Sequence, residues 1–288
     1  MKDFIKSTIE RANIICEALP YIRKYSGKTI VVKYGGNAMN DEAVTTTILQ
    51  DIAALKIVGV NPILVHGGGP EINKMLSRLG VQPQFKNGLR VTDEQTMEVA
   101  QMILCGKINK NIVGELNGMG VKAIGLCGKD SQLIKAETLD KDLGYVGRIT
   151  EINAKLLEIL AKDEFIPVIA SIGTDEAGNS YNINADTAAA AIGAAMHAEK
   201  LLFLSDIDGI MTDKDDPNTL IDRINVSGLK KMIADGSISG GMVPKAESCI
   251  DAIERGIGSV LVLNGTLPHS ILLELFTDSG VGTMIEQD

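Results

Sequence analysis

A short apolar run that ends in a lysine and two glycines constrains this chain most. Residues 30–32 are β-branched, which predicts a strand buried on both faces. Lys33 closes the strand, and Gly35 and Gly36 let the backbone turn sharply and let a ligand approach closely. A lysine beside open backbone N–H groups suits a phosphate. A plain turn with a solvated lysine explains the same residues, so both interpretations stay open.

The same pattern returns at residues 61–70. An apolar run ends in His66, three glycines follow, and Pro70 suits the first turn of the helix predicted over 70–79. Two strands that each deliver glycine N–H groups to a ligand predict two anionic groups held face to face.

Strands alternate with helices along the rest of the chain. The apolar runs predict further strands over 121–126, 165–171, 201–204 and 259–263. This alternation is typical of an α/β protein with a mostly parallel sheet that helices cover on both faces. Ligands bind such folds at the carboxyl ends of the strands, and the glycine-rich and aspartate-rich turns lie there.

Two helix signals concern the start and the middle of the chain. Residues 1–20 predict an amphipathic helix that ends at Pro20, with one apolar face made of Ile5, Ile9, Ala12, Cys16 and Leu19. No βαβ unit needs this helix, so its apolar face packs either on its own domain or on another subunit. Thr92 and Gln95 are spaced as a capping box for a helix over 93–105.

Composition argues against several classes of protein. The net charge of −9 argues against nucleic acid as the main partner. The four cysteines and three histidines are scattered without metal-ligand spacing, so we expect no metal site, and reduced thiols are favoured over disulfides. The N-terminus lacks a signal-peptide pattern, and residues 187–198 are too short to span a bilayer. We therefore expect a soluble cytoplasmic protein with no membrane partner.

Three familiar motifs are missing from the sequence. It has no P-loop, no G-x-G-x-x-G fingerprint and no G-x-S-x-G elbow, so hydride transfer and nucleophilic hydrolysis lose support. Glycine turns, lysines and acidic turns without an evident base suit phosphoryl transfer, in which a protein mainly positions groups and neutralises charge. Lys245 follows Pro244 in a predicted first helical turn, where a phosphate would compensate about 0.3–1 kcal/mol of unfavourable dipole interaction. The alternative is that Lys245 points to solvent.

Six motifs occur in a characteristic order. They are K-Y-G-G-N-A-M over 33–39, H-G-G-G over 66–69, N-G-L-R over 87–90, N-I-N-A-D over 182–186, S-D-I-D-G over 205–209 and G-G-M-V-P-K over 240–245. Together they resemble the amino acid kinase family over essentially the whole chain. The first and last motifs are family-wide, whereas H-G-G-G with N-G-L-R-V-T is similar to the members that phosphorylate N-acetyl-L-glutamate.

The resemblance implies a three-layer αβα sandwich with a mostly parallel central sheet. It implies a kinase of arginine biosynthesis that transfers a phosphoryl group from ATP, with Mg²⁺, to the side-chain carboxylate of N-acetyl-L-glutamate, giving N-acetyl-L-glutamyl 5-phosphate. It also divides the chain into a helical extension (1–25), a lobe for the amino-acid substrate (26–180) and a lobe for ATP (181–288), all on one continuous sheet.

The resemblance assigns roles to the residues at matching positions. Lys33 and Lys245 stabilise the transferring phosphoryl group, and Asp186 holds both lysines. The residues that bind N-acetylglutamate are Gly68, Gly69, Arg90 and Asn182. The residues that bind the nucleotide are Gly35, Gly36, Ser205, Asp206, Ile207, Asp208, Gly209, Ile210, Ser237, Ile238 and Ser239. No residue is assigned as a metal ligand.

Structural roles compete with some of these assignments. Arg90 can cap a hairpin, Asn182 can be a turn residue, and Asp186 can simply start a helix. Asp206 and Asp208 can merely shape their turn. His66 is expected to be a structural partner of its loop and not a catalyst.

Both ends of the chain resemble arginine-inhibited members of the family. The first helix with residues 19–25 resembles the extension through which such members form hexamers, as trimers of dimers. Residues 269–283 resemble their arginine site. L-Arginine is therefore the expected inhibitor, and the residues expected to bind it beside the first helix are Lys200, Asp278, Gly280 and Gly282.

Two other functions stay open. A sister kinase for carbamate, aspartate, glutamate or a nucleoside monophosphate shares the lysines and glycines but differs at residues 87–92. A non-catalytic sensor of arginine or nucleotide would be favoured by loss of a site lysine, and Lys33, Asp186 and Lys245 are all present. The hairpin expected over 131–149 has no assigned role, and a lid over the acceptor is one interpretation.

Overall fold

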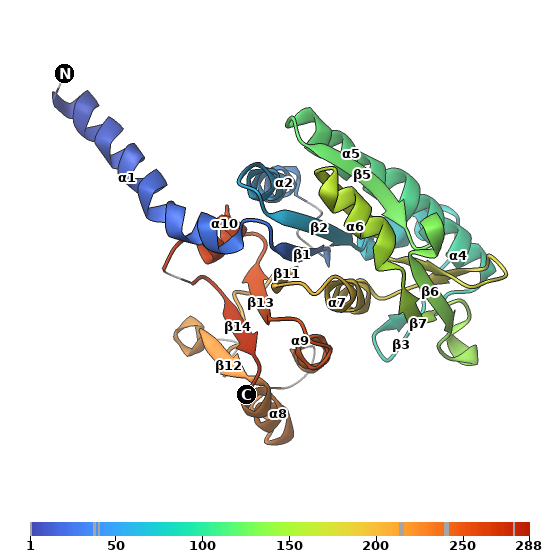
Figure 1. Ribbon diagram of the computed structural model, residues 1–288. Coiled ribbons are helices and arrows are strands. Elements are labelled where there is room, and N and C mark those ends of the chain that lie inside the picture. Colours follow the sequence, from blue (N-terminus) through green and yellow to red (C-terminus); the bar gives the residue numbers. More distant parts are fainter. Residues whose placement is uncertain (1, 37–38, 40, 213–215, 239–241, 279) are drawn as a thin grey trace.

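The computed structural model describes residues 2–36, 39, 41–212, 216–238, 242–278 and 280–288 (Figure 1). Its centre is an eight-stranded sheet in the order β12-β14-β13-β11-β1-β2-β8-β5. The strands are β1 (Thr29–Tyr34), β2 (Asn61–His66), β5 (Lys122–Cys127), β8 (Phe165–Ala170), β11 (Lys200–Ser205), β12 (Arg223–Asn225), β13 (Ser259–Asn264) and β14 (Thr283–Glu286). Within this sheet only β13 and β14 pair antiparallel, so the prediction of a mostly parallel sheet is confirmed.

Helices cover both faces of this sheet and complete the expected αβα sandwich (Figure 1). The helices are α1 (Lys2–Tyr25), α2 (Glu42–Ile57), α3 (Gly69–Arg78), α4 (Glu94–Gln101), the π-helix η2 (Met102–Ile108), α5 (Asn109–Gly118), α6 (Ala154–Lys162), α7 (Ala185–Ala195), α8 (Val226–Ala234), α9 (Met242–Glu254) and α10 (Ser270–Phe276). The described residues also include the short 3₁₀ turns η3 (Asp130–Gln132), η4 (Lys141–Leu143) and η5 (Pro217–Thr219).

The consecutive β-branched residues of β1 serve two separate cores. Ile30 and Val32 belong to the cluster that packs against α2, α5 and α10, whereas Val31 belongs to the cluster that packs against α7 and α9. All three side chains are completely buried. Because alternate residues of a strand point to opposite faces, a strand between two helical layers has to be apolar at every position.

Two smaller sheets lie beside the central one. The four-stranded sheet has the order β10-β9-β6-β7 and consists of β6 (Ile134–Thr138), β7 (Gly147–Ile152), β9 (Ile172–Thr174) and β10 (Ser180–Asn182). Its antiparallel β6–β7 pair confirms the expected hairpin. The other sheet pairs β3 (Phe85–Lys86) with β4 (Leu89–Arg90) around Asn87 and Gly88, which both have positive φ angles as a tight hairpin turn requires.

The structure corrects two helix predictions. Helix α1 continues through Pro20 to Tyr25, and the carbonyl of exposed Cys16, which loses its partner at Pro20, can bond to water. The helix predicted over 93–105 begins at Glu94 and runs through η2 and α5 to Gly118, because the π-helical segment carries it past Gly106.

The predicted capping box is also wrong. The cap of α4 is Asp93, whose carboxylate accepts from the Thr96 N–H at 2.8 Å. Thr92 is completely buried, and its hydroxyl donates instead to the Arg90 carbonyl at 2.8 Å. Because its hydroxyl bonds to the β4 strand, Thr92 does not cap the helix.

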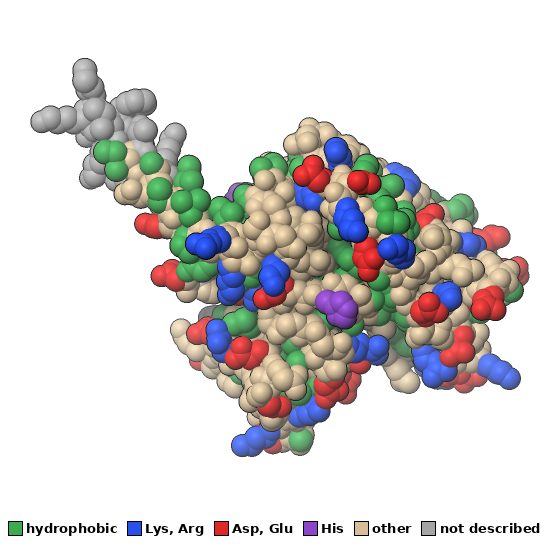
Figure 2. Space-filling model, in the orientation of Figure 1, with side chains coloured by type: hydrophobic (Ala, Val, Ile, Leu, Met, Phe, Trp, Pro, Cys, Tyr) green, Lys and Arg blue, Asp and Glu red, His purple; other side chains and the backbone are tan. Residues whose placement is uncertain are grey.

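Helix α1 extends away from the body of the molecule (Figures 1 and 2). Ile9 and Leu19, on the predicted apolar face, are 54% and 53% exposed, and Ala12 and Cys16 on that face are exposed too. Only towards its end does the helix reach the body, where Tyr25 is buried. At the positions of this face whose side chains are described, the face is therefore not covered by its own chain. In the described residues, no helix is both long and apolar enough to cross a membrane.

We predict that truncating the central strand β2 destabilises the protein far more than truncating a surface helix. Leu64 is completely buried, so Leu64→Ala should lower the free energy of unfolding by about 2–5 kcal/mol through lost burial and a cavity. Leu79→Ala, at a side chain that is 52% exposed, is the control and should change it by about 0.5 kcal/mol or less. Urea unfolding measures both, and equal losses would contradict the two-core description.

Candidate active site

The two predicted glycine turns lie side by side at the carboxyl edge of the central sheet. β1 and β2 are parallel neighbours, and their last residues, Tyr34 and His66, are in register. The Gly67 N–H donates to the Tyr34 carbonyl at 3.1 Å. A cavity of about 280 Å³ opens between the turns, and its lining includes Lys33, Gly35, Gly36, Gly67, Gly68, Gly69, Arg90, Ser171, Asn182 and Asp186.

An ion pair crosses this cavity. The Lys33 ammonium lies 2.9 Å from the Asp186 carboxylate, and the two side chains are 13% and 22% exposed. Asp186 stands in the first turn of α7, where the Asn184 side chain caps its N–H. A Cβ at Gly35 would lie only 3.3 Å from the Lys33 nitrogen, so the glycine gives the ammonium its place above the turn.

Lys245 approaches the same pair from the other half of the chain. It is half-buried in the first turn of α9. Burial lowers the pKa of Lys245, the Asp186 carboxylate opposes this shift, and the Lys33 ammonium adds to it. Two ammonium groups therefore share one carboxylate, and an anion placed between them would be stabilised by both.

Arg90 lines the cavity and has a donor without a partner among the described residues. The residue is 8% exposed, and Nη2 donates to the Gly69 carbonyl at 3.2 Å. Nη1 is buried and has no partner among the described residues. Burial lowers the pKa of Arg90, and the Phe85 ring lies 4.9 Å away in a cation–π contact. A buried charged donor without a partner is costly, and a carboxylate in the cavity would remove that cost.

Asn182 reaches the cavity from the end of β10. Its side-chain N–H₂ donates to the Thr92 hydroxyl at 3.1 Å, which connects it to the strand that carries Arg90. The structure thus brings all four residues predicted to bind the amino-acid substrate to one cavity.

The predicted nucleotide segment lies at the end of β11, the strand beside β1. Within it the Asp208 carboxylate accepts from the Asn264 amide at 2.7 Å, and the Ile210 N–H donates to the Thr283 hydroxyl at 2.8 Å. Asp206 interacts electrostatically with Lys245, which links this segment to the lysine pair.

The second predicted nucleotide segment follows α8. Ser237 is exposed and donates its hydroxyl to Asp235 at 2.6 Å, whereas Ile238 is buried. Ser239 lies outside the described residues. Of the lysine motif over 240–245, residues 240–241 also lie outside them.

His66 is a structural partner of its loop, as expected. The ring is completely buried; Nδ1 lies 2.9 Å from the Gly67 carbonyl and Nε2 lies 3.1 Å from the Asn109 side-chain nitrogen. Burial lowers the pKa of His66 to about 4. Sequence reasoning missed Asn109, because no motif surrounds it and its partners come from three distant strands.

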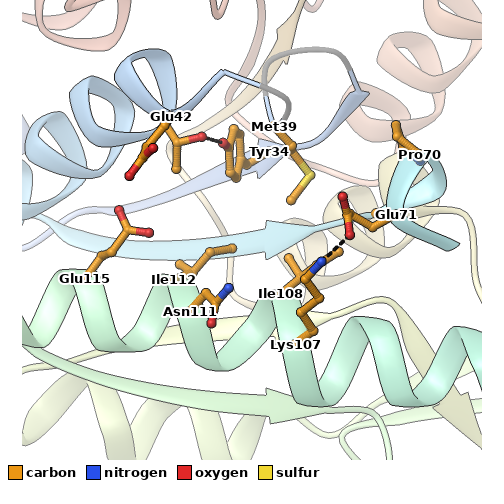
Figure 3. Close-up of a pocket in the computed structure, with 12 residues that line it drawn as sticks. Tyr34, Met39, Glu42, Pro70, Glu71, Lys107, Ile108, Asn111, Ile112 and Glu115 are labelled. Carbon is orange, nitrogen blue, oxygen red and sulfur yellow. Dashed lines mark hydrogen bonds and ion pairs between the residues drawn. The ribbon is translucent and has the colours of Figure 1, made fainter. Parts of the chain in front are cut away.

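A second cavity, of about 320 Å³, lies between α2, α3 and the η2–α5 segment (Figure 3). It contains the ion pair between Lys107 of η2 and Glu71 of α3 (Figure 3). Gly68 and Pro70 line both this cavity and the one that holds Lys33. The second glycine turn is therefore a thin wall between two cavities.

A third cavity, of about 640 Å³, lies at the amino end of the central strands. Lys200 is the first residue of β11 and pairs with Ile30 at the start of β1, away from the lysine pair. All four residues predicted to bind arginine line this cavity, together with the end of α1: Tyr21, Lys24, Tyr25, Lys200, Asp278, Gly280 and Gly282.

Lys200 is buried within this third cavity. It is 8% exposed, and its ammonium donates to the Ser259 hydroxyl at 3.0 Å. The ring of Tyr25 lies 5.9 Å from the ammonium. Burial lowers the pKa of Lys200. Glu274, also on the lining, accepts from the Val281 N–H at 2.9 Å and thereby holds the loop around Gly280 and Gly282.

Comparisons with known proteins identify the family of the chain. A model of the amino acid kinase family matches residues 28–264. The chain is 55% identical to an acetylglutamate kinase of Caldicellulosiruptor bescii, with 99% of both chains covered. It is 50% identical to an acetylglutamate kinase of Methanocaldococcus jannaschii, with 97% of both covered.

A protein whose structure was solved with bound ligands is similar in fold to the chain. It is N-acetylglutamate synthase from Neisseria gonorrhoeae with coenzyme A and N-acetyl-glutamate, with a TM-score of 0.85 at 26% identity, covering 96% of this chain and 63% of that protein. The same synthase with coenzyme A and L-arginine gives a TM-score of 0.81 at 25% identity, covering 96% of this chain and 65% of that protein.

We predict that His66 makes the protein sensitive to mild acid. The folded protein keeps the ring neutral because its pKa is about 4, whereas an unfolded chain binds a proton near pH 6.5. The stability that depends on the neutral ring is complete above pH 6.5 and is lost as the pH falls towards 4, by about 1.4 kcal/mol per pH unit.

Urea unfolding at several pH values between these limits measures the slope, and His66→Asn, which cannot titrate there, is the control. A wild-type slope equal to that of the variant would contradict the prediction.

Proposed function

The chain belongs to the amino acid kinase family. We propose that it transfers the γ-phosphoryl group of ATP to the side-chain carboxylate of N-acetyl-L-glutamate, the compound for which its acetylglutamate kinase relatives are named. The observation that carries this proposal is Arg90, which lines the same cavity as Lys33 and whose buried Nη1 has no partner among the described residues. A substrate with two carboxylates suits this pair: one binds Arg90 and the other reacts near Lys33.

The chemistry follows from charge. A side-chain carboxylate is ionised near neutral pH, so no general base is required. Its oxygen attacks the γ-phosphorus, a P–O bond forms, the bond to the bridging oxygen of ADP breaks, and ADP leaves with the electron pair. The barrier comes from repulsion between two anions, which Lys33 and Lys245 relieve while Asp186 fixes their positions.

Backbone N–H groups complete the proposed charge stabilisation. Gly35 and Gly36 serve the ATP phosphates, and Gly68 and Gly69 serve the reacting carboxylate. Asn182 binds the substrate from the opposite side of the cavity. Gly68 also has no room for a side chain, because a Cβ would clash with Ile108, and a Cβ at Gly35 would crowd the Lys33 ammonium.

The nucleotide is proposed to bind along the end of β11. The proposed lining is residues 205–210 with Ser237 and Ile238, and the electrostatic interaction of Asp206 with Lys245 supports a position of this segment next to the phosphoryl group. Ser239, which was also predicted, lies outside the described residues. Residues 26–180 then form the acceptor lobe and residues 181–288 the ATP lobe. No group of three or more potential metal ligands is assembled in the described residues, so Mg²⁺, which would add positive charge to the phosphates, is proposed to be held by ATP oxygens and water.

We predict an acyl phosphate product only with N-acetylglutamate. The assay traps the product with hydroxylamine in the presence of MgATP, with N-acetylglutamate, glutamate, aspartate or N-acetylaspartate as acceptor. Turnover with another acceptor would indicate a sister kinase. Nucleotide binding without turnover on any acceptor would indicate a sensor.

We predict that Arg90→Lys weakens acceptor binding selectively. The loss of a bidentate charged contact, about 1.5–3 kcal/mol, should raise the KM for N-acetylglutamate roughly 10- to 150-fold and leave the KM for ATP unchanged. Arg148→Lys is the matched control because its side chain is 64% exposed on β7. Equal changes in both KM values for Arg90→Lys would contradict the role of Arg90.

Feedback inhibition by L-arginine is proposed at the third cavity. Its lining offers carboxylates at Glu274 and Asp278 for a guanidinium, and the Lys200 ammonium and the amides near Gly280 and Gly282 for a carboxylate. The synthase solved with L-arginine has a similar fold. Because the cavity includes the end of α1, a ligand there would hold the direction of that helix.

A hexamer built as a trimer of dimers is proposed on the same helix. The apolar face with Ile9, Cys16 and Leu19 is exposed, and packing against a helix from a second copy would bury it. A cytoplasmic location, expected from cysteine usage, stays a prediction.

We predict that deleting residues 1–25 gives an active dimer with weakened arginine inhibition. The deletion removes the exposed helix together with Tyr21, Lys24 and Tyr25 of the third cavity. Sedimentation gives the assembly, and the hydroxylamine assay gives the inhibition.

Asp278→Asn should weaken inhibition without changing the assembly, and Asp163→Asn, at an exposed position, is its control. An unchanged hexamer after the deletion would contradict this proposal.

A further inference from the structure

Three strands and one helix meet at a buried polar network behind the glycine turn. Asn109 is 1% exposed, and its side-chain nitrogen donates to the Val168 carbonyl of β8 at 2.9 Å and to His66 Nε2 at 3.1 Å. Its side-chain oxygen accepts from the Lys110 ammonium at 3.1 Å. A Cβ at Gly125 of β5 would lie 1.9 Å from that oxygen, so the amide sits directly on the strand. The mechanism described above uses none of these groups.

The partners assign the proton on the His66 ring. A carbonyl oxygen only accepts, so Nδ1, which faces the Gly67 carbonyl, must carry a hydrogen. The Asn109 nitrogen faces the Val168 carbonyl as well, so it is the donor to Nε2, which must be unprotonated. The ring is therefore neutral and in the Nδ1–H form, whereas a neutral histidine in water prefers the Nε2–H form.

This tautomer fixes the plane of the next peptide. The Gly67 carbonyl accepts from His66, and the Gly67 N–H is held separately by the Tyr34 carbonyl. The described peptide bonds are all trans, and in a trans peptide the C=O and N–H groups point in opposite directions. The Gly68 N–H therefore points away from the His66 ring, and Gly68 lines the cavity that contains Lys33 and Arg90.

The junction of the π-helix η2 with α5 holds the same turn at three successive positions. Lys107 forms an ion pair with Glu71 in the first turn of α3 (Figure 3). Ile108 packs so closely on Gly68 that a Cβ there would lie 2.3 Å from its terminal carbon. Asn109 then reaches His66. Irregular π-helical turns are frequent at functional sites, and this one presents consecutive side chains to one short segment.

We propose that His66 and Asn109 are positioning residues for phosphoryl transfer: through the Gly67 carbonyl they aim the Gly68 N–H at the reacting oxygen of the acceptor. This inference rests on the proposed function, in which Gly68 binds the acceptor carboxylate. The N–H acts like an oxyanion-hole donor, whose value depends on its direction being set before the reaction. His66 touches neither substrate, so it acts only through the backbone.

Steady-state kinetics with MgATP and N-acetylglutamate tests the proposal. His66→Leu removes the hold on the Gly67 carbonyl and should lower kcat/KM for N-acetylglutamate by about 10- to 100-fold, less than the roughly 100- to 1,000-fold loss of a whole oxyanion donor. The KM for ATP should not change. His66→Asn keeps a donor near the Nδ1 position and should recover most of the rate.

Two further variants sharpen this experiment. Asn109→Leu frees Nε2 to take the proton and should lower kcat/KM in the same direction, by less than His66→Leu. His197→Asn, at an exposed histidine, is the control and should behave like wild type. A folded His66→Leu protein with wild-type constants, or a loss shared equally by both substrates, would overturn the proposal.

A measurement without any acceptor separates this inference from the proposed function. The chain has three histidines, so ¹⁵N-histidine NMR of the wild-type protein resolves each ring, and the signals absent from His66→Asn identify His66. We expect a neutral Nδ1–H ring at pH 7. An Nε2–H ring would overturn the proposal even if the enzyme is active, whereas an Nδ1–H ring in a protein without N-acetylglutamate turnover would overturn the proposed function alone.

Discussion

The Lys33–Asp186 ion pair is the contact on which the arrangement of this protein depends. Lys33 comes from the first central strand and Asp186 from the start of α7 in the second half of the chain, and their charged atoms lie 2.9 Å apart. Asp186 also balances Lys245 of α9. Without the carboxylate, two half-buried ammonium groups would repel each other. With it, the repulsion between the two ammonium groups is offset at the edge where the glycine turns end.

The second constraint is that the backbone, more than side chains, must meet the ligand. A Cβ at Gly35 would crowd the Lys33 ammonium, and a Cβ at Gly68 would clash with Leu104 and Ile108. Both backbone groups of Gly67 are held: its N–H donates to the Tyr34 carbonyl, and its carbonyl accepts from the His66 ring. The buried His66–Asn109 pair thus does for the backbone what Asp186 does for the lysines. In both cases one residue sets the direction of another group that reaches the ligand.

Local signals in the sequence predict the fold well and the site in part. Residues 30–32 predict a two-sided strand because burial on both faces demands apolar side chains in succession, and Asn87-Gly88 predicts its hairpin through positive φ angles. The co-location of Lys33, Asp186 and Lys245 was available only from a family resemblance. Asn109 escaped prediction because it is 43 residues from His66 in sequence. The continuation of α1 past Pro20 depends on solvent access that sequence periodicity does not report.

The most direct test of the central claim follows one oxygen atom. N-acetyl-L-glutamate labelled with ¹⁸O in its side-chain carboxylate is incubated with the protein, MgATP and hydroxylamine, and the released phosphate is examined by ³¹P NMR. Hydroxylamine attacks the carbonyl carbon, so phosphate leaves with the oxygen that attacked phosphorus. The account predicts one ¹⁸O in each released phosphate. Unlabelled phosphate would mean that water is the acceptor, and it would contradict a site built to hold two anions face to face.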